Sequence, residues 1–112
     1  MNVRFLYTLL KNLSSKTFGK GEIVIHEGDK SNSVFYIRKG LVRSYFVNHK
    51  GEEITFQLFA ERQIFGNVHA ILFHEPSKFM FEALEKTKVY YTDAKTFQDL
   101  TSAQSVFLNT DS

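Results

Sequence analysis

Residues 21–43 read GEIVIHEGDKSNSVFYIRKGLVR, and this stretch decides the expected fold. Short runs of Val, Ile, Phe and Tyr alternate with glycine-containing turns, as they do in the strands of an antiparallel sheet. Gly28 and Gly40 fall where the chain must reverse, at positions where only glycine adopts a positive φ without strain. We therefore expect two strands in this stretch, at Glu22–His26 and Val34–Arg38.

The same pattern continues through the following residues. Further strands are expected at Leu41–Val47, Glu53–Phe59, Phe79–Ala83 and Lys88–Thr92. Short strands at regular spacing predict a mainly β fold: a jelly-roll-like β-roll, or double-stranded β-helix, of about eight strands with short flanking α-helices. The positions expected to be buried are Val24, Val34, Tyr36, Val42, Ile54, Phe56 and Val89.

Three segments have helical rather than strand-like patterns. Apolar residues recur at three- and four-residue steps over Asn2–Leu13, which predicts an N-terminal helix. Val68–Phe73 lacks strand alternation and is expected to form a short helix. Thr92 or Asp93 is expected to cap a further helix at Ala94–Leu100.

Length and composition indicate one folded domain. The chain has 112 residues, of which 43% are hydrophobic and 15% aromatic, enough to build a core. We assign residues 1–100 to the β-roll with its N-terminal helix, and residues 101–112 to a tail or the start of another helix. The absence of cysteine excludes disulfides, iron–sulfur clusters and thiolate zinc sites.

Charge and hydropathy exclude two classes of partner. The 14 basic residues are interspersed with 12 acidic ones, so no basic stripe is present and direct DNA binding by this chain is not expected. No apolar run approaches the ~18 residues of a membrane span. Lys11 and Asn12 interrupt the apolar N-terminal stretch, which argues against a signal peptide and predicts a cytoplasmic location.

The glycines, acidic residues and apolar pairs of residues 21–43 resemble those of the cyclic-nucleotide-binding β-roll, and most of all the sensor half of CRP/FNR-type bacterial transcription regulators. The resemblance extends from about Phe18 to Leu100. It implies a sensory or regulatory ligand-binding module without catalytic residues or a cofactor. Its signal would pass through the C-terminal helix to a partner DNA-binding domain or a second copy of the chain.

The resemblance also places a phosphate-binding cassette. In the family, this cassette opens with Phe-Gly-Glu, continues as a short helix and closes with Arg-Ser/Thr-Ala. The helix N-terminus and backbone amides hold the cyclic phosphate. The glutamate accepts a hydrogen bond from the ribose 2′-hydroxyl, and the arginine pairs with the phosphate.

This chain departs from the cassette pattern at its charged positions. Asn67 stands at the glutamate, Ser77 at the arginine, and Phe79 at the small alanine. A charged hydrogen bond contributes ~1.5–3 kcal/mol, so its loss lowers affinity about tenfold or more. Lys78 lies one residue further on, where a strand turns its side chain to the other face. We expect negligible affinity for cyclic nucleotides and, at most, weak capture of a small anion. The candidate ligand-binding residues are Gly66, Asn67, Val68, His69, Ala70, Ser77 and Lys78.

Two alternatives remain open. One is a cupin-like metal-dependent enzyme, since cupins share a related roll and bind metal through a His-x-His pair. The four histidines, none of which stands in such a pair, are His26, His49, His69 and His74. We therefore expect no metal site. The other alternative is a structural dimerisation module without a ligand. For the isolated chain we expect a monomer or weak dimer, with apolar surface near Val106–Leu108.

Overall fold

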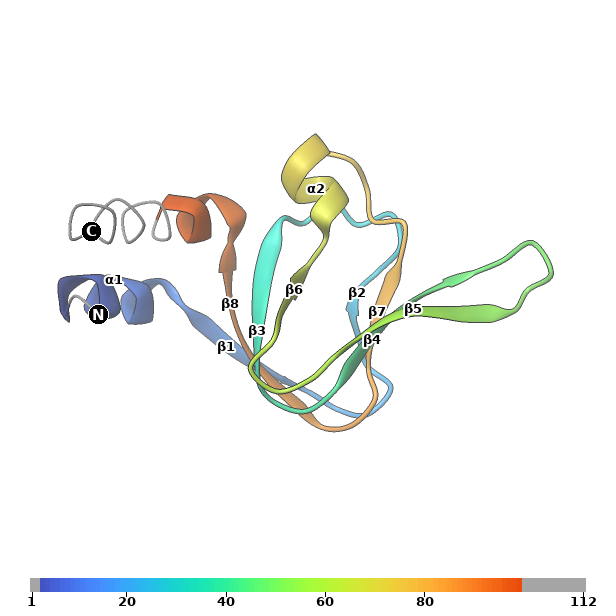
Figure 1. The fold of residues 1–112 in the computed structure, drawn as a ribbon, viewed down its shortest axis with the longest axis horizontal. Coiled ribbons are helices and arrows are strands. Elements are labelled where there is room, and N and C mark those ends of the chain that lie inside the picture. Colours follow the sequence, from blue (N-terminus) through green and yellow to red (C-terminus); the bar gives the residue numbers. More distant parts are fainter. Residues whose placement is uncertain (1–2, 100–112) are drawn as a thin grey trace, which may run out of the picture.

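A computed structural model describes residues 3–99 of the chain, apart from some side chains in the first helix. The elements follow one another as α1 (Val3–Asn12), β1 (Ser14–Phe18), β2 (Ile23–Ile25), β3 (Ser33–Lys39), β4 (Val42–Val47), β5 (Glu53–Phe59), β6 (Ile64–Gly66), α2 (Val68–Phe73), β7 (Met80–Ala83) and β8 (Thr87–Asp93). Residues 94–99 form a further helical segment after β8 (Figure 1).

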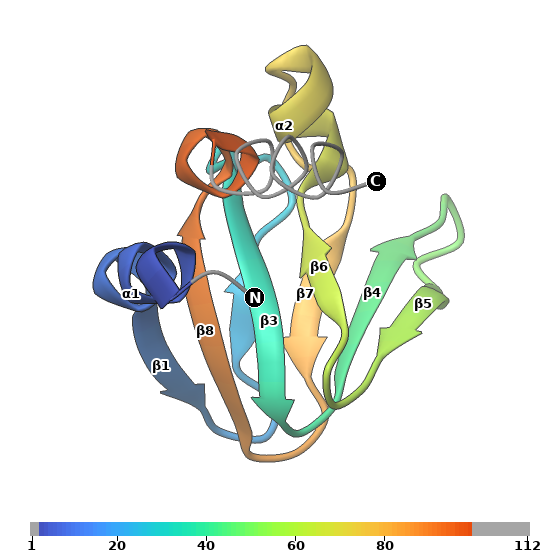
Figure 2. The same ribbon diagram turned by 60° about the vertical axis from the view of Figure 1, so that its left-hand side comes forward.

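The strands form two four-stranded antiparallel sheets. One has the order β1-β8-β3-β6 and the other the order β2-β7-β4-β5. The chain crosses repeatedly from one sheet to the other, so strands far apart in sequence become neighbours, as β1 and β8 do (Figure 2). The prediction of a mainly β roll with short flanking helices is confirmed.

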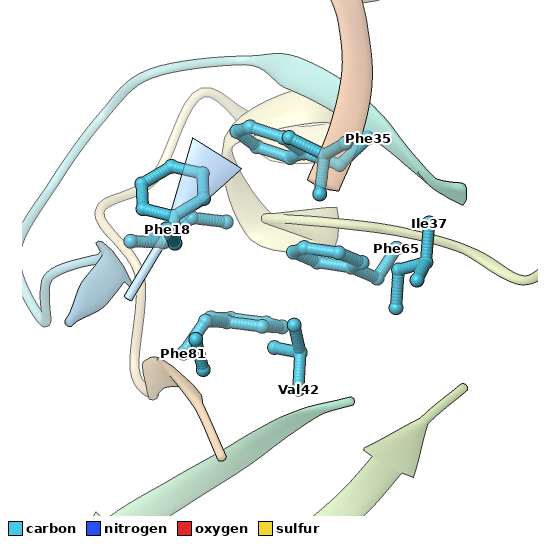
Figure 3. Close-up of a cluster of buried hydrophobic side chains, with 9 residues drawn as sticks. Phe18, Phe35, Ile37, Val42, Phe65 and Phe81 are labelled. Carbon is cyan, nitrogen blue, oxygen red and sulfur yellow. The ribbon is translucent and has the colours of Figure 1, made fainter. Parts of the chain in front are cut away.

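Phenylalanine rings fill the space between the two sheets. Phe65 stacks on Phe35 with ring centroids 5.0 Å apart, and on Phe81 at 5.7 Å. Ile37 and Val42 are completely buried beside these rings (Figure 3). Because a buried aromatic ring removes ~150–250 Å² from water, these rings make a large contribution to the core of the roll.

Two of the predicted core positions are confirmed as fully buried, namely Val42 and Val89. In β3 the phase is reversed: Phe35 and Ile37 point into the core, whereas Val34 and Tyr36 are half-buried. Val24 is also half-buried and packs against the edge of the core. The side chains of a strand alternate between its faces, so a wholly apolar strand has two equally plausible inward sets.

The prediction was wrong for Ile54 and Phe56, which are 39% and 59% exposed. Both lie on β5, the edge strand of its sheet. The hairpin of β4 and β5 projects from the body of the roll (Figure 1). The opposite sheet, β1-β8-β3-β6, therefore does not cover most of β5. An alternating apolar pattern therefore indicated a strand here, but not its burial.

The sequence did not locate β1 and β6. The β1 residues Ser14–Phe18 are mostly polar, and four of the five are exposed, so the strand is held by pairing with β8. Strand β6 has only three residues and pairs with β3. The short helix at Val68–Phe73 is confirmed with its predicted bounds. The N-terminal helix ends at Asn12, one residue before the predicted end, while its predicted first residue, Asn2, lies outside the described residues.

Asp93 caps the segment 94–99, since its Oδ1 accepts a hydrogen bond from the amide of Thr96 at 2.7 Å. This confirms the predicted cap, although Leu100, the predicted end of that helix, lies outside the described residues. The predicted tail at 101–112, with its apolar residues Val106–Leu108, also lies outside them.

Both glycines singled out in the sequence adopt a positive φ, +87° at Gly28 and +128° at Gly40. Gly40 is also in close contact with another strand. A β-carbon added there would overlap Thr87 Oγ1 and would lie 2.6 Å from Thr87 Cα. The turn between β3 and β4 therefore needs glycine both for its backbone angle and for the approach of β8.

Candidate ligand-binding site

A cavity of about 490 Å³ opens where β6 passes into α2. Its volume lies within the ~300–1,000 Å³ typical of small-molecule sites. Five phenylalanines line it: Phe56, Phe59, Phe65, Phe79 and Phe81. The predicted site residues that it brings together are Gly66, Asn67, Val68, His69 and Ser77. The cassette therefore lies beside a cavity with a mainly aromatic wall.

Gly66 allows β6 to lie close against β3. It pairs with Val34, and a β-carbon at Gly66 would lie 2.9 Å from the carbonyl oxygen of Ser33. The same β-carbon would be 3.3 Å from Ile71 Cδ1 in α2. A side chain here would therefore separate the start of α2 from the sheet, which explains the glycine without reference to a ligand.

Asn67 is the N-cap of α2, and its side chain is occupied at both ends. Oδ1 accepts a hydrogen bond from the amide of Ala70 at 3.2 Å, and Nδ2 donates to the carbonyl of Asp29 at 2.9 Å. Only 2% of Asn67 is exposed. The side chain thus links α2 to the loop after β2. The amide of Ala70, expected to face an anion, is already bonded to this cap.

Ser77, at the position of the family's arginine, is buried to the same degree, with 4% of its surface exposed. Its hydroxyl donates to the carbonyl of Phe79 at 2.7 Å and accepts from the amide of Phe79 at 3.2 Å. The backbone amide of Ser77 donates to the carbonyl of Asp29 at 2.8 Å. These hydrogen bonds hold the loop before β7 in place.

Lys78 and Ala70 are separated from the cavity. Lys78 is exposed and does not line it. Ala70 is the buried residue of α2, with 3% exposure, and is likewise absent from the wall. Phe79 instead extends the wall: it stacks on Phe56 at a centroid distance of 4.9 Å and meets Phe46 edge-on at 6.0 Å.

Within residues 3–99, His69 is the one readily titratable side chain that lines the cavity. Its Nδ1 lies 3.9 Å from Glu75 Oε2, across the C-terminal turn of α2. No lysine, arginine, aspartate or glutamate of the described chain joins it in the wall. A ligand in the cavity would therefore meet aromatic carbon and a few neutral polar groups.

A strongly held cation, Arg43, lies on the other face of β4. Arg43 donates to Glu53 Oε1 at 2.7 Å and to Glu82 Oε1 at 2.8 Å, and its guanidinium lies 4.0 Å from the ring centroid of Tyr45. The hydrogen bond to Glu53 is the largest effect raising the pKa of Arg43. Because strand neighbours face opposite sides, Arg43 points away from the cavity that Ser44 lines.

Ser44 is the functional candidate that the sequence did not reveal. It is 1% exposed, and its hydroxyl has no hydrogen-bond partner among the described residues. Ser44 pairs with Gln57 on one side and Phe81 on the other, and all three residues line the cavity. The available signal was a lone serine at an inward position, two residues after the buried Val42.

The histidines do not come together. His26, His49 and His74 are exposed, and only His69 lines the cavity. Across residues 3–99, no group of three or more His, Cys, Asp or Glu side chains is arranged to hold a metal ion. In that same part of the chain, no helix combines the length and apolar character needed to cross a membrane.

Known proteins with the same fold include bacterial transcription regulators and a kinase subunit. The catabolite activator protein of Thermus thermophilus superimposes with a TM-score of 0.78 at 16% identity, over 97% of this chain and 51% of that one. The sensor domain of the transcriptional regulator DNR from Pseudomonas aeruginosa superimposes with a TM-score of 0.77 at 19% identity, over 99% of this chain and 79% of that one. The regulatory subunit of a cAMP-independent protein kinase A from Trypanosoma cruzi, bound to guanosine, superimposes with a TM-score of 0.74 at 23% identity, over 90% of this chain and 38% of that one.

This chain thus spans about half the length of the Thermus protein and less of the kinase subunit. A search of curated proteins found no significant match. The model of the cyclic nucleotide-binding domain matches residues 15–104, which is most of the chain. The chain therefore belongs to the cyclic nucleotide-binding domain family.

Proposed function

We propose that this domain is a sensory or regulatory module with a degenerate phosphate-binding cassette, which binds neither cyclic AMP nor cyclic GMP at physiological concentration. The observation that carries the proposal is the burial of Ser77 and the hydrogen bonding of its hydroxyl. Its hydroxyl is buried and bonded in both directions to the backbone of Phe79, so it is not available to a phosphate. A serine also lacks the charge and the paired donors with which arginine holds a phosphate.

The surroundings of the cassette support the same proposal. A cyclic phosphate carries a full negative charge, and bringing it into an aromatic cavity is costly unless a cation compensates it. Lys78 is exposed and absent from the wall, and Arg43 is engaged by two glutamates on the other face of its sheet. Asn67, at the ribose-binding position, is committed to the cap of α2. What remains for an anion is the start of α2, which supports only weak capture of sulfate, phosphate or a carboxylate.

A ligand without a phosphate has a precedent among proteins of this fold. The Trypanosoma cruzi subunit is described as cAMP-independent and is bound to guanosine, a nucleoside. That description applies to the other protein, whose identity to this chain is 23%. It supports the proposal to this extent: loss of cyclic nucleotide dependence and retention of a ligand pocket are compatible in one fold.

We further propose that the domain acts as the sensor part of a cytoplasmic CRP/FNR-type transcription regulator and is not an enzyme. Its signal would pass through the segment after β8 to a DNA-binding domain or a second copy. The support is the likeness to the Thermus activator, of which this chain covers about half, and to the sensor domain of DNR.

Isothermal titration calorimetry of the unmodified chain tests the cassette proposal. We expect no saturable heat with cyclic AMP or cyclic GMP up to about 1 mM, a limit that corresponds to about 4 kcal/mol of binding free energy. A micromolar dissociation constant for either nucleotide would refute the proposal. If Lys78→Ala then removed that binding, Lys78 would be the cation that replaces the arginine.

The converse experiment restores the family's residues. Ser77→Arg, combined with Asn67→Glu and Phe79→Ala, is expected to raise the affinity for cyclic AMP to a measurable level. Because Ser77 and Asn67 both hold the local backbone, circular dichroism must first establish that the variant folds. Ser77→Arg alone is the milder variant, and it retains the cap of α2.

A further inference from the structure

We propose that the phenylalanine-lined cavity binds a small, uncharged aromatic molecule that carries a hydroxyl group and exchanges a hydrogen bond with Ser44 Oγ. This rests on the proposed function, because it assigns a ligand class to the same degenerate pocket. Four observations carry it: the size of the cavity, the arrangement of its rings, the unpartnered hydroxyl and the lack of charge in the wall.

The size of the cavity suits a ligand of two or three fused rings. Its volume is about 490 Å³. An apolar cavity of ~150 Å³ is enough to hold benzene. The cavity is open at one side, where Phe56 leaves 59% of its surface exposed. A bound ring would cover this exposed apolar surface, which otherwise remains in contact with water.

The rings of the wall already stack on one another. Phe56 and Phe79 lie with centroids 4.9 Å apart and ring planes 19° apart, at one end of the wall. Phe59 and Phe65 stack at 5.4 Å, and Phe65 continues the series to Phe81 at 5.7 Å. Aromatic rings favour such offset stacking over a face-to-face sandwich, and a flat ligand would extend the same series.

The hydroxyl of Ser44 is the feature that points to a polar group on the ligand. A buried hydroxyl without a partner is unfavourable, and native proteins contain few such groups without a reason. Ser44 lies on β4 between Gln57 and Phe81, and all three belong to the cavity wall. Its oxygen has almost no contact with solvent, so water in the cavity leaves it unsatisfied, and a ligand hydroxyl must displace neighbouring wall atoms slightly to reach it.

The lack of charge in the wall sets the charge of the ligand. Of the described residues that line the cavity, His69 on α2 is the one with an ionisable side chain, and it lies near Glu75 in the loop after that helix. An ionic ligand would lose its hydration among phenylalanine rings and gain no ion pair with a lysine or arginine of the wall. An uncharged ligand does not meet that penalty.

Fluorescence titration with 2-naphthol provides the test, with naphthalene as the same ring system without the hydroxyl and 2-naphthalenesulfonate as its anionic counterpart. We expect saturable binding of 2-naphthol, weaker binding of naphthalene, and binding of the sulfonate that is weaker than either, in keeping with at most weak capture of an anion at the start of α2. In Ser44→Ala, the affinity for 2-naphthol should fall about tenfold, while that for naphthalene stays unchanged. The melting temperature of the unliganded variant should rise, because the unsatisfied hydroxyl is gone.

Ser15→Ala is the matched control, since Ser15 is exposed on β1, and it should change neither affinity nor melting temperature. An equal loss of affinity for both probes in Ser44→Ala would overturn the hydrogen bond, because it would indicate a reshaped cavity. Absence of binding by both neutral probes, or tighter binding of the sulfonate, would overturn the ligand class while leaving the cassette proposal standing. Displacement of 2-naphthol by micromolar cyclic AMP would instead refute the cassette proposal itself.

Discussion

Replacing Asn67 with alanine is the sharpest test of the view that this residue stabilises the cassette rather than binding a ligand. The change removes the cap of α2, which is worth about 1 kcal/mol, and with it the acceptor for the amide of Ala70. It also removes the hydrogen bond to the carbonyl of Asp29, worth about 1 kcal/mol. That carbonyl keeps the amide of Ser77 as a second donor at 2.8 Å, so it is not left unsatisfied.

We therefore expect Asn67→Ala to lower the free energy of unfolding by about 2 kcal/mol, because two contributions of about 1 kcal/mol are lost. For a domain of this size that corresponds to a fall of about 10 °C in melting temperature. Asn67→Ser is the matched variant: serine retains a capping oxygen but lacks the side-chain amide that donates to the carbonyl of Asp29. It should cost about 1 kcal/mol, since only the second hydrogen bond is lost.

Urea denaturation followed by circular dichroism measures both variants, with the slope of the transition expected to stay constant. Refutation would be a free energy of unfolding for Asn67→Ala within about 0.5 kcal/mol of the unmodified chain, the usual range for surface substitutions. Equal losses in the serine and alanine variants would contradict the assignment of Oδ1 as the cap.

Two further predictions concern the turn after β3 and the helical segment after β8. Gly40→Ala should lower the free energy of unfolding by about 3 kcal/mol, because alanine there has a positive φ and overlaps Thr87. Gly51→Ala should lower it by only about 1 kcal/mol, because Gly51 has a positive φ but open space around it. The urea midpoints of the two variants measure this difference. Hydrogen bonds from Thr96 lower the pKa of Asp93, so its cap is complete above the ordinary aspartate pKa and is lost as pH falls through the lowered value. The amide shift of Thr96 should report this loss, and Asp93→Asn should abolish its pH dependence.

The short helix beside the candidate site could be predicted from the sequence, because it depends on local features. Phe65-Gly66 followed by a segment without strand alternation was enough to place α2, and its bounds were correct. The substitution of the family's arginine by Ser77 was also visible. What Ser77 does instead was not, since its hydrogen bonds run to the backbone of Phe79 in a conformation that residue types do not specify.

Ser44 could not be recognised as part of the site from its neighbours in sequence. It lies on β4, and it reaches the cavity because β4 pairs with β5 and β7. An orphaned hydroxyl is a property of the assembled wall: the same serine on an outward face would be hydrated and without consequence. Predicting it requires the register of three strands, which is set by long-range contacts.

The sequence by itself determined where the chain turns and where it extends. Gly28 and Gly40 need backbone angles that other residues adopt only with strain, and these angles act over a few bonds, so the turns follow directly from the residue types. Tertiary structure alone decided which side of β3 is buried. Phe35 and Val34 are both apolar, and the inward one is whichever the opposite sheet covers. Burial depends on what lies across the roll, whereas a turn depends only on its own backbone.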